Sequence, residues 1–187
     1  MYNSTEHYKV RGPVTEFGNA PETPSIIKNV GWTLGNYCPH KCKHCYSMSA
    51  RRLGANMTPE IVDRIVEQLA KNNVETINLG GNEPIFTNGP NVKDSLLPYI
   101  IERLDSYGLS AGITTSGDTL LYLYKYRPDI YEKINDFDIS LDSPFKEEHN
   151  ANRGDDLYAD VSYAEEENVP VVSNNVVIKE KSDIKIE

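Results

Sequence analysis

Short apolar runs alternate along the chain with segments that carry an apolar residue every three or four positions. The short runs favour strands, because they are bounded by Gly, Pro, Asn or Asp, and the other segments favour helices. We expect strands at residues 29–36, 75–79, 109–114, 137–141 and 170–178, and helices from residue 58 and at 94–107, 118–126 and 156–168.

Two helix ends carry recognisable capping residues. Thr58 precedes Pro59, which predicts Thr as the N-cap and Pro at the first helical position. Gly108 follows the segment 94–107, where a glycine in the C′ position ends a helix. The helix after Thr58 keeps a helical period of apolar residues that we expect to face a core: Ile61, Val62, Ile65, Val66 and Leu69.

Strands that alternate with helices predict βα units and a parallel sheet, which makes this an α/β fold. Five strands are too few for an eight-stranded barrel, so we expect either an open, partial barrel or a piece of a longer enzyme, and favour the latter. Residues 1–29 form an N-terminal extension in this interpretation, and residues 30–187 form one domain. The polar, Gly-containing segments all follow the expected strands, where ligands of parallel sheets bind.

Composition narrows the possible functions. The 187 residues carry a formal net charge of -9, which argues against a nucleic-acid partner. No apolar run is long enough to span a membrane, and the polar N-terminus is not a signal peptide. Three clustered cysteines do not form a disulfide framework, so we expect a reducing, cytoplasmic location.

All three cysteines lie in the stretch YCPHKCKHCY, with the spacing C-x3-C-x2-C: Cys38, Cys42 and Cys45. Three thiolates on one short loop can hold three irons of a cubane cluster, which four cysteines usually bind. The absent fourth cysteine would leave one iron open to a ligand that is not protein. The alternative is a structural zinc site that adds His40 or His44, although such sites usually combine two separated pairs of ligands.

This loop resembles the signature of the radical S-adenosylmethionine (radical SAM) superfamily. The resemblance implies a partial (βα)6-type barrel, here with its sixth strand missing or truncated. It also implies a [4Fe-4S] cluster whose open iron binds S-adenosylmethionine and cleaves it to a 5′-deoxyadenosyl radical. In this interpretation His44 and Tyr46 shield the cluster, and His40 is solvated.

Later segments extend the resemblance at the following strand ends. Gly80, Gly81, Asn82 and Glu83 are similar to the family's GGE motif, which binds the amino group of the cofactor, although Asn82 is an insertion; the alternative is an ordinary glycine turn. By the same resemblance we expect further contacts with the cofactor from Thr115, Ser116, Ser140 and Asp142.

Two further candidates lie towards the C-terminus. Arg153 belongs to a segment that resembles the H-x3-R-G found in many peptide-modifying members, where it would pair with the cofactor carboxylate. Equally, it could form a surface salt bridge with Asp155 or Asp156. Asn175 interrupts an apolar run and is a candidate for contact with the adenine or the substrate.

Within the superfamily the motifs look most like maturases of ribosomally made peptides, and among them the peptide spliceases. This resemblance implies excision of tyramine from a precursor peptide, leaving an α-keto-β-amino acid. It also implies a small leader-peptide-binding partner protein and a reductant such as a flavodoxin or ferredoxin. The alternatives are a peptide epimerase, a cross-linking enzyme, a glycyl-radical activase, or a non-catalytic iron–sulfur or zinc-binding subunit.

Overall fold

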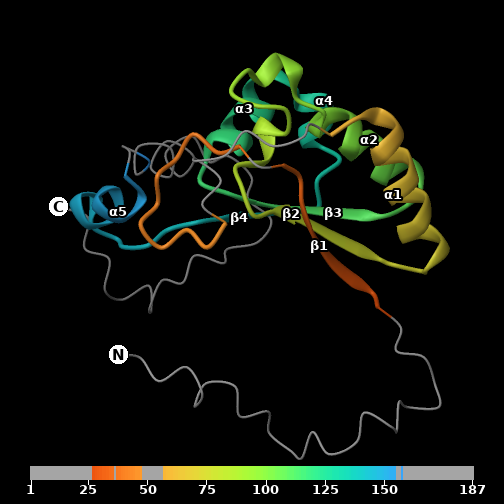
Figure 1. Cartoon of the computed structure of the whole chain (residues 1–187), viewed down its shortest axis with the longest axis horizontal. Helices are drawn as coiled ribbons and strands as arrows, with labels where there is room; N and C mark the ends of the chain where they lie inside the picture. The colour runs from red at the N-terminus through yellow and green to blue at the C-terminus, as the bar shows by residue number, and fades with distance from the viewer. Residues whose placement is uncertain (1–26, 36, 48–56, 155–156, 158–187) are drawn as a thin grey trace, which may run out of the picture.

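The computed structural model describes residues 27–35, 37–47, 57–154 and 157. Within them, four parallel strands form one sheet in the order β1-β2-β3-β4 (Figure 1). Each neighbouring pair is joined by a crossover, which is the connection that parallel strands require. The strands are β1 Asn29–Thr33, β2 Thr76–Gly80, β3 Ser110–Thr115 and β4 Asp136–Ile139.

The crossovers contain most of the helices, and these gather on one side of the sheet (Figure 1). A further helix, α5, follows β4 and lies beside the loop that leaves β1. The helices are α1 Pro59–Lys71, η2 Pro84–Phe86, η3 Val92–Asp94, α2 Leu97–Ser106, α3 Asp118–Tyr126, α4 Pro128–Tyr131 and α5 Lys146–Arg153.

The core lies between the sheet and the helices on this side. Every second residue of the strands points towards the helices, as the alternation of side chains requires, and these residues are apolar except for Thr115 at the end of β3. Burial of these side chains supplies the main force that holds the layers together. The largest fully buried side chains include Phe137, Leu34, Ile77, Leu79, Ile113, Ile100, Ile101, Leu104, Leu120 and Leu123.

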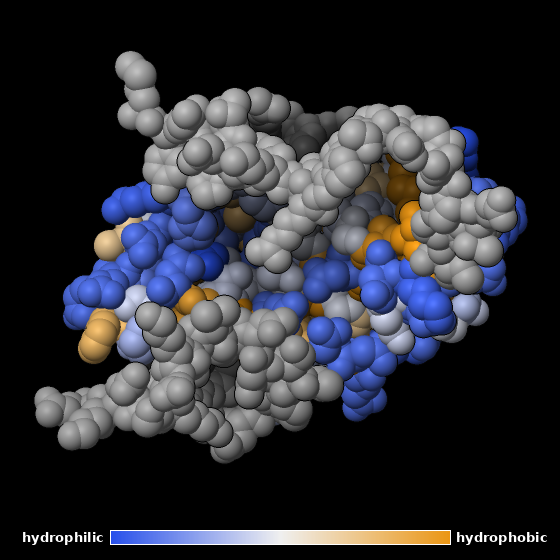
Figure 2. Space-filling model, turned by 90° about the horizontal axis from the view of Figure 1, so that it is seen from below, coloured by the Kyte–Doolittle hydropathy of each residue, from blue (hydrophilic) through white to orange (hydrophobic). Residues whose placement is uncertain are grey.

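The opposite side of the sheet is polar, because the remaining strand positions carry small or hydrogen-bonding residues. Three of them interact across strands: the Thr114 hydroxyl donates to Asn78 Oδ1 at 3.0 Å, and Asn78 Nδ2 donates to Asp138 Oδ2 at 3.4 Å. Figure 2, in which the molecule is seen from below, shows hydrophilic side chains together with some apolar ones in the middle of the view. A polar sheet face is typical of a surface that meets water or a ligand rather than a second core layer.

The structure confirms the expected strands in 29–36, 75–79, 109–114 and 137–141, with the first ending at Thr33. Both caps are also confirmed: Thr58 Oγ1 accepts from the N–H of Ile61, and Gly108 has a φ of 69°. Of the apolar stripe of α1, Val62 and Val66 are fully buried, whereas Ile61 is 42% exposed. The expectation that all five apolar residues of this helix face the core is therefore wrong for Ile61.

The helix expected at 94–107 begins later, at Leu97. Pro98 lies in its first turn, where a residue without an N–H is tolerated. Ser95 has extended backbone, with a φ of -66° and a ψ of 131°, and so separates the short helix η3 from α2. Helices α4 and α5 were not predicted from the sequence.

Apart from Leu157, the expected helix at 156–168 and the expected strand at 170–178, with Asn175, lie outside the described residues. The structure therefore bears on four strands of the expected partial barrel and not on a fifth or sixth. Among the described residues, none of the helices combines the length and apolar character that crossing a membrane requires.

Candidate functional site

A cavity of about 550 Å³ lies at the carboxyl ends of the four strands. Its wall combines the cysteine loop after β1 with the segments that follow β2, β3 and β4, as expected for a parallel sheet. The residues that line it include Cys38, Cys42, Cys45, Gly80, Gly81, Asn82, Glu83, Thr115, Ser116, Ser140 and Arg153.

The cysteine loop is tied to its surroundings by its backbone. Asn82 Nδ2 donates to the carbonyl oxygen of Tyr37 at 2.9 Å, just before the first cysteine. The N–H of Lys43 donates to the carbonyl oxygen of Asn152 at 2.8 Å, which joins the second half of the loop to the end of α5. The three cysteines are free thiols and are each partly buried. The loop thus brings three thiols to one wall of the cavity.

Burial changes the acidity of two of these thiols. It raises the pKa of Cys38 to about 11, although the N–H of His40 donates to this sulfur and opposes the shift. Burial also raises the pKa of Cys42, where the charge of Arg153 acts in the opposite direction. Without a metal these two groups are therefore thiols at neutral pH, and metal binding would release their protons.

The turn after β2 brings its backbone close to the cavity. Gly81 has a φ of 84°, and a Cβ atom at this position would collide with the side chain of Thr33. Only glycine fits both conditions. The next residue, Asn82, uses its Nδ2 as a donor, while its Oδ1 is buried without a hydrogen-bond partner among the described residues. An acceptor of this kind matches a ligand that carries a donor, such as an ammonium group.

Glu83 lies at the same turn but points towards α3. Its side chain is only 1% exposed. Its carboxylate accepts hydrogen bonds from the Thr115 hydroxyl, the Ser116 N–H at 2.8 Å, the Thr119 N–H at 3.0 Å and the Thr119 hydroxyl at 2.5 Å. The carboxylate also lies at the N-terminal end of α3, where negative charge is favourable. Glu83 thus joins the ends of β2 and β3 to this helix.

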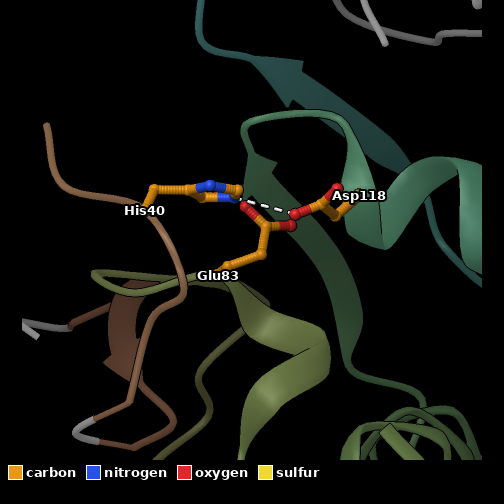
Figure 3. A group of neighbouring side chains, drawn as sticks. All are labelled: His40, Glu83 and Asp118. Carbon is orange, nitrogen blue, oxygen red and sulfur yellow. Dashed lines mark ion pairs between the residues drawn. The ribbon is translucent and has the colours of Figure 1, made fainter. Parts of the chain in front are cut away.

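His40 and Asp118 lie next to Glu83, and the three side chains form one group, as Figure 3 shows. His40 Nε2 lies 2.8 Å from Asp118 Oδ2, and the imidazole is buried, so the expectation that His40 is solvated is wrong. The ligand atoms of His40, Glu83 and Asp118 lie within 4.8 Å of one another, a spacing that a metal ion could also span. The Glu83 carboxylate already accepts four hydrogen bonds, so a structural cluster accounts for this geometry without a metal.

Arg153 pairs with Asp142, with Nη2 2.5 Å from Oδ1. The two side chains are 11% and 15% exposed, so this pair is shielded and differs from the surface salt bridge considered above. Asp155 and Asp156 lie outside the described residues. Arg153 also donates a hydrogen bond to Cys42, which places a positive charge between the loop and the segment after β4.

His149 supports this arrangement from α5. Its Nδ1 accepts the N–H of Asp142 at 3.2 Å, and the ring is fully buried. Burial, together with the charge of Arg153, lowers the pKa of His149, so the ring is neutral at neutral pH. His44 differs from both buried histidines, because its side chain is 55% exposed and lies 3.7 Å from Asp142.

The structure gathers the expected site residues at one end of the sheet, apart from Asn175, which lies outside the described residues. Asp142 is not among the lining residues of the cavity, but it pairs with Arg153, which is. Sequence reasoning did not single out Asp118 and Thr119, although both stand at the start of a helix that follows a strand end, or Asn78 and Thr114 on the open face. The alternation of polar residues within β2 and β3 was the available signal for the last two.

Comparison with known proteins settles the family. The radical SAM superfamily matches residues 32–187, most of the chain. The chain belongs to this superfamily. A [4Fe-4S] cluster and S-adenosylmethionine follow as its cofactors, and Cys38, Cys42 and Cys45 have the corresponding spacing.

Curated relatives include a probable GTP 3′,8-cyclase from Pyrococcus horikoshii, 28% identical over 165 residues that make up 86% of this chain and 50% of the relative. A similar protein from Thermococcus kodakarensis is 28% identical over 60% of this chain and 40% of its own length. The chain thus spans half or less of the curated relatives it matches.

Solved structures share the fold. SuiB from Streptococcus suis bound to S-adenosylmethionine has a TM-score of 0.58 and 19% identity, covering 77% of this chain and 32% of SuiB. SuiB bound to precursor peptide SuiA gives a TM-score of 0.55 at 19% identity, over 76% of this chain and 31% of SuiB. At this identity the likeness concerns the fold alone.

Proposed function

We propose that this protein is a radical SAM enzyme that modifies a ribosomally synthesised precursor peptide, by excising tyramine to leave an α-keto-β-amino acid. The observation that carries the choice of substrate class is the scarcity of positive charge among the described residues that line the cavity. The full reaction rests on the resemblance of the cysteine loop, the Gly80–Pro84 turn and the segment around Arg153 to peptide-modifying enzymes.

The residues present fit the two cofactors. Cys38, Cys42 and Cys45 would hold three irons of the cluster, because their thiols share one wall of the cavity. The close approach at Gly81 and the buried Oδ1 of Asn82 suit the ammonium group of S-adenosylmethionine. Together the bound cofactors supply a 5′-deoxyadenosyl radical for hydrogen abstraction.

The other candidate residues would serve the cofactor in different ways. Ser140 lines the cavity and would contact its polar groups, whereas Glu83, Thr115 and Ser116 would hold the strand ends in place. Arg153 would attract the cofactor carboxylate from its place beside Cys42, with Asp142 fixing its orientation. The role given to Asn175 stays a prediction from the sequence.

Charge separates a peptide from a nucleoside triphosphate as substrate. Arg153 is the one lysine or arginine among the described residues that line the cavity, and it already pairs with Asp142. Below the strand ends, the open face carries Asp136 and Asp138. Burial raises the pKa of Asp136, and the negative charge of Asp138 raises it further. A triphosphate needs several positive or N–H donors to offset its charge, whereas peptide amides need only neutral hydrogen-bonding groups.

A peptide substrate also agrees with the structural comparison, since SuiB shares this fold and was solved with a precursor peptide. Cyclisation of GTP is the second candidate, because the curated relatives are probable GTP 3′,8-cyclases. In the proposed reaction, a small partner protein that binds the leader peptide delivers the substrate. A flavodoxin or ferredoxin supplies the electron.

The test uses the anaerobically reconstituted protein with S-adenosylmethionine, a reductant and, in separate reactions, GTP or the precursor peptide encoded nearest its gene. Mass spectrometry should show a peptide that has lost the NH–CH(CH₂C₆H₄OH) unit of one tyrosine, which has two hydrogens fewer than free tyramine, and no change in GTP. Loss of two hydrogens would identify a cross-linking enzyme, and an unchanged mass with an altered stereocentre would identify an epimerase. Conversion of GTP alone would refute a peptide substrate.

A further inference from the structure

We propose that His40 is a positioning residue for the cluster: its contact with Asp118 fixes the first half of the cysteine loop against the N-terminal end of α3. The inference concerns the three cysteines as cluster ligands and therefore rests on that part of the proposed function. His40 is one of the three residues between Cys38 and Cys42, and the C-x3-C spacing does not specify which residues these are.

His40 is held from both ends. Its backbone N–H donates to the sulfur of Cys38. Its ring points towards Asp118, and Nε2 lies 2.8 Å from Asp118 Oδ2 (Figure 3). Since the residue is only 7% exposed, its ring has little freedom to move. One residue therefore links the first cysteine to a helix of the fold.

Asp118 is itself anchored to the sheet. It is the first residue of α3, and its neighbour Thr119 donates both its N–H and its hydroxyl to Glu83. Thr119 Oγ1 also accepts the N–H of Ile85 at 3.0 Å. The contacts run from the loop through His40 and Asp118 into α3, and from Thr119 into the turn after β2. The cysteine loop and the turn that bears Asn82 are therefore both held by the N-terminal end of α3.

The second histidine of the loop provides a contrast within the same motif. His44 is largely exposed, and its closest approach to Asp142 is 3.7 Å, beyond hydrogen-bond distance. The other half of the loop is held instead through its backbone, by the bond from the Lys43 N–H to the Asn152 carbonyl. The two halves thus have separate supports, and His40 supplies the side-chain support of the first.

Rigid placement of thiolate ligands slows loss of the metal, since a bond that opens can close again before the iron leaves. Removing the imidazole should therefore increase the rate at which the cluster loses iron, without unfolding the protein. Gln at this position supplies an NH₂ group that can donate to Asp118 and should restore part of the effect. A role confined to overall stability would change the unfolding temperature and iron release together.

The experiment compares the full chain carrying His40→Ala, His40→Gln, Asp118→Ala or the double Ala substitution, with Lys41→Ala as the matched control. Lys41 occupies the same spacer but is exposed. After anaerobic reconstitution, iron release to a coloured chelator is timed, and thermal unfolding is followed by circular dichroism. We expect about tenfold faster release for His40→Ala and Asp118→Ala, no further increase in the double variant, and wild-type behaviour for Lys41→Ala.

A second readout does not require the cluster. In the metal-free protein, labelling of Cys38 by iodoacetamide should be several-fold faster in His40→Ala than in the wild type and Lys41→Ala. If the wild type binds no cluster, the proposed function fails, but this readout still tests the placement of the loop. Equal labelling in all variants, or additive effects of the two Ala substitutions on iron release, would overturn the proposal.

Discussion

Replacing Glu83 tests whether this carboxylate supports the fold or binds the cofactor. The family resemblance assigns the segment Gly80–Glu83 to the cofactor amino group, yet the Glu83 carboxylate is buried and accepts four hydrogen bonds. We expect Glu83→Ala to destabilise the fold, and Asn82→Ala to weaken cofactor binding instead. The two substitutions therefore separate the two roles.

The magnitude follows from the donors that Glu83 leaves behind. The hydroxyls of Thr115 and Thr119 can rotate towards other acceptors, whereas the N–H groups of Ser116 and Thr119 are fixed by the backbone. Each buried, unsatisfied N–H costs about 1–3 kcal/mol, so Glu83→Ala should lower the free energy of unfolding by about 2–6 kcal/mol. Glu83→Gln retains an acceptor oxygen and places an NH₂ group opposite the Ser116 N–H, which costs about 1–3 kcal/mol.

The assay is urea unfolding of the full chain, followed by circular dichroism in the absence of cofactor. Glu148→Gln serves as the matched control, because Glu148 is exposed and accepts one hydrogen bond, from Ser143 at 2.8 Å. This control should remain within about 0.5 kcal/mol of the wild type, as is usual for surface positions. Where the whole stability of a domain is about 5–15 kcal/mol, a loss of the expected size shifts the midpoint clearly.

The same variants are also compared for their affinity for S-adenosylmethionine. Losing a hydrogen bond to a charged group costs about 1.5–3 kcal/mol, so Asn82→Ala should weaken binding of S-adenosylmethionine by about tenfold or more. Glu83→Gln should retain most of its affinity if it folds. A Glu83→Gln protein of normal stability that has lost cofactor binding would refute the structural role.

Three further predictions concern single groups. Burial raises the pKa of Cys38 to about 11. The rate of iodoacetamide labelling of this residue in metal-free protein should therefore rise with pH up to about pH 11, and its midpoint should lie above that of a free cysteine peptide. A labelling midpoint near pH 9 would contradict this. Burial lowers the pKa of His149, so the unfolded chain binds a proton that the folded chain does not, and the free energy of unfolding should fall as the pH decreases below about 6.5; His149→Asn should remove this part of the slope, and an unchanged slope would contradict it. Gly81→Ala should destabilise the protein by at least about 1 kcal/mol, measured by urea unfolding, since both its φ of 84° and the side chain of Thr33 oppose a Cβ; wild-type stability would contradict the turn geometry.

Much of the sheet could be predicted because its signal is local. The strands are short apolar runs between polar turns, and the caps at Thr58 and Gly108 depend on neighbouring residues only. Helix α5 escaped prediction for the opposite reason: His149 is the one buried side chain of its eight residues, so the helix has no apolar period. Helix α4 is a single turn of four residues, too short to show a period at all.

The sequence was enough to predict where the site lies, but not which of its residues face the cavity and which support the fold. Strand order and the carboxyl-end rule place the cysteine loop and the turn after β2 together. They do not reveal that Glu83 turns towards Thr119, 36 residues later, or that His40 meets Asp118. Such contacts depend on how far each loop extends and which way each helix enters, which are properties of the assembled fold. The neighbouring Asn82 and Glu83 therefore look equivalent in the sequence and differ in the structure.

The most direct test of the account is electron paramagnetic resonance of the anaerobically reconstituted, reduced protein, recorded with and without S-adenosylmethionine. Three cysteine ligands leave one iron for the cofactor, so we expect about four irons and four sulfides per chain and a signal whose g-values change when the cofactor is added. The Cys42→Ala variant should lose the signal. A wild-type protein that binds one zinc in place of iron, or a cluster signal that saturating S-adenosylmethionine does not alter, would contradict the central claim.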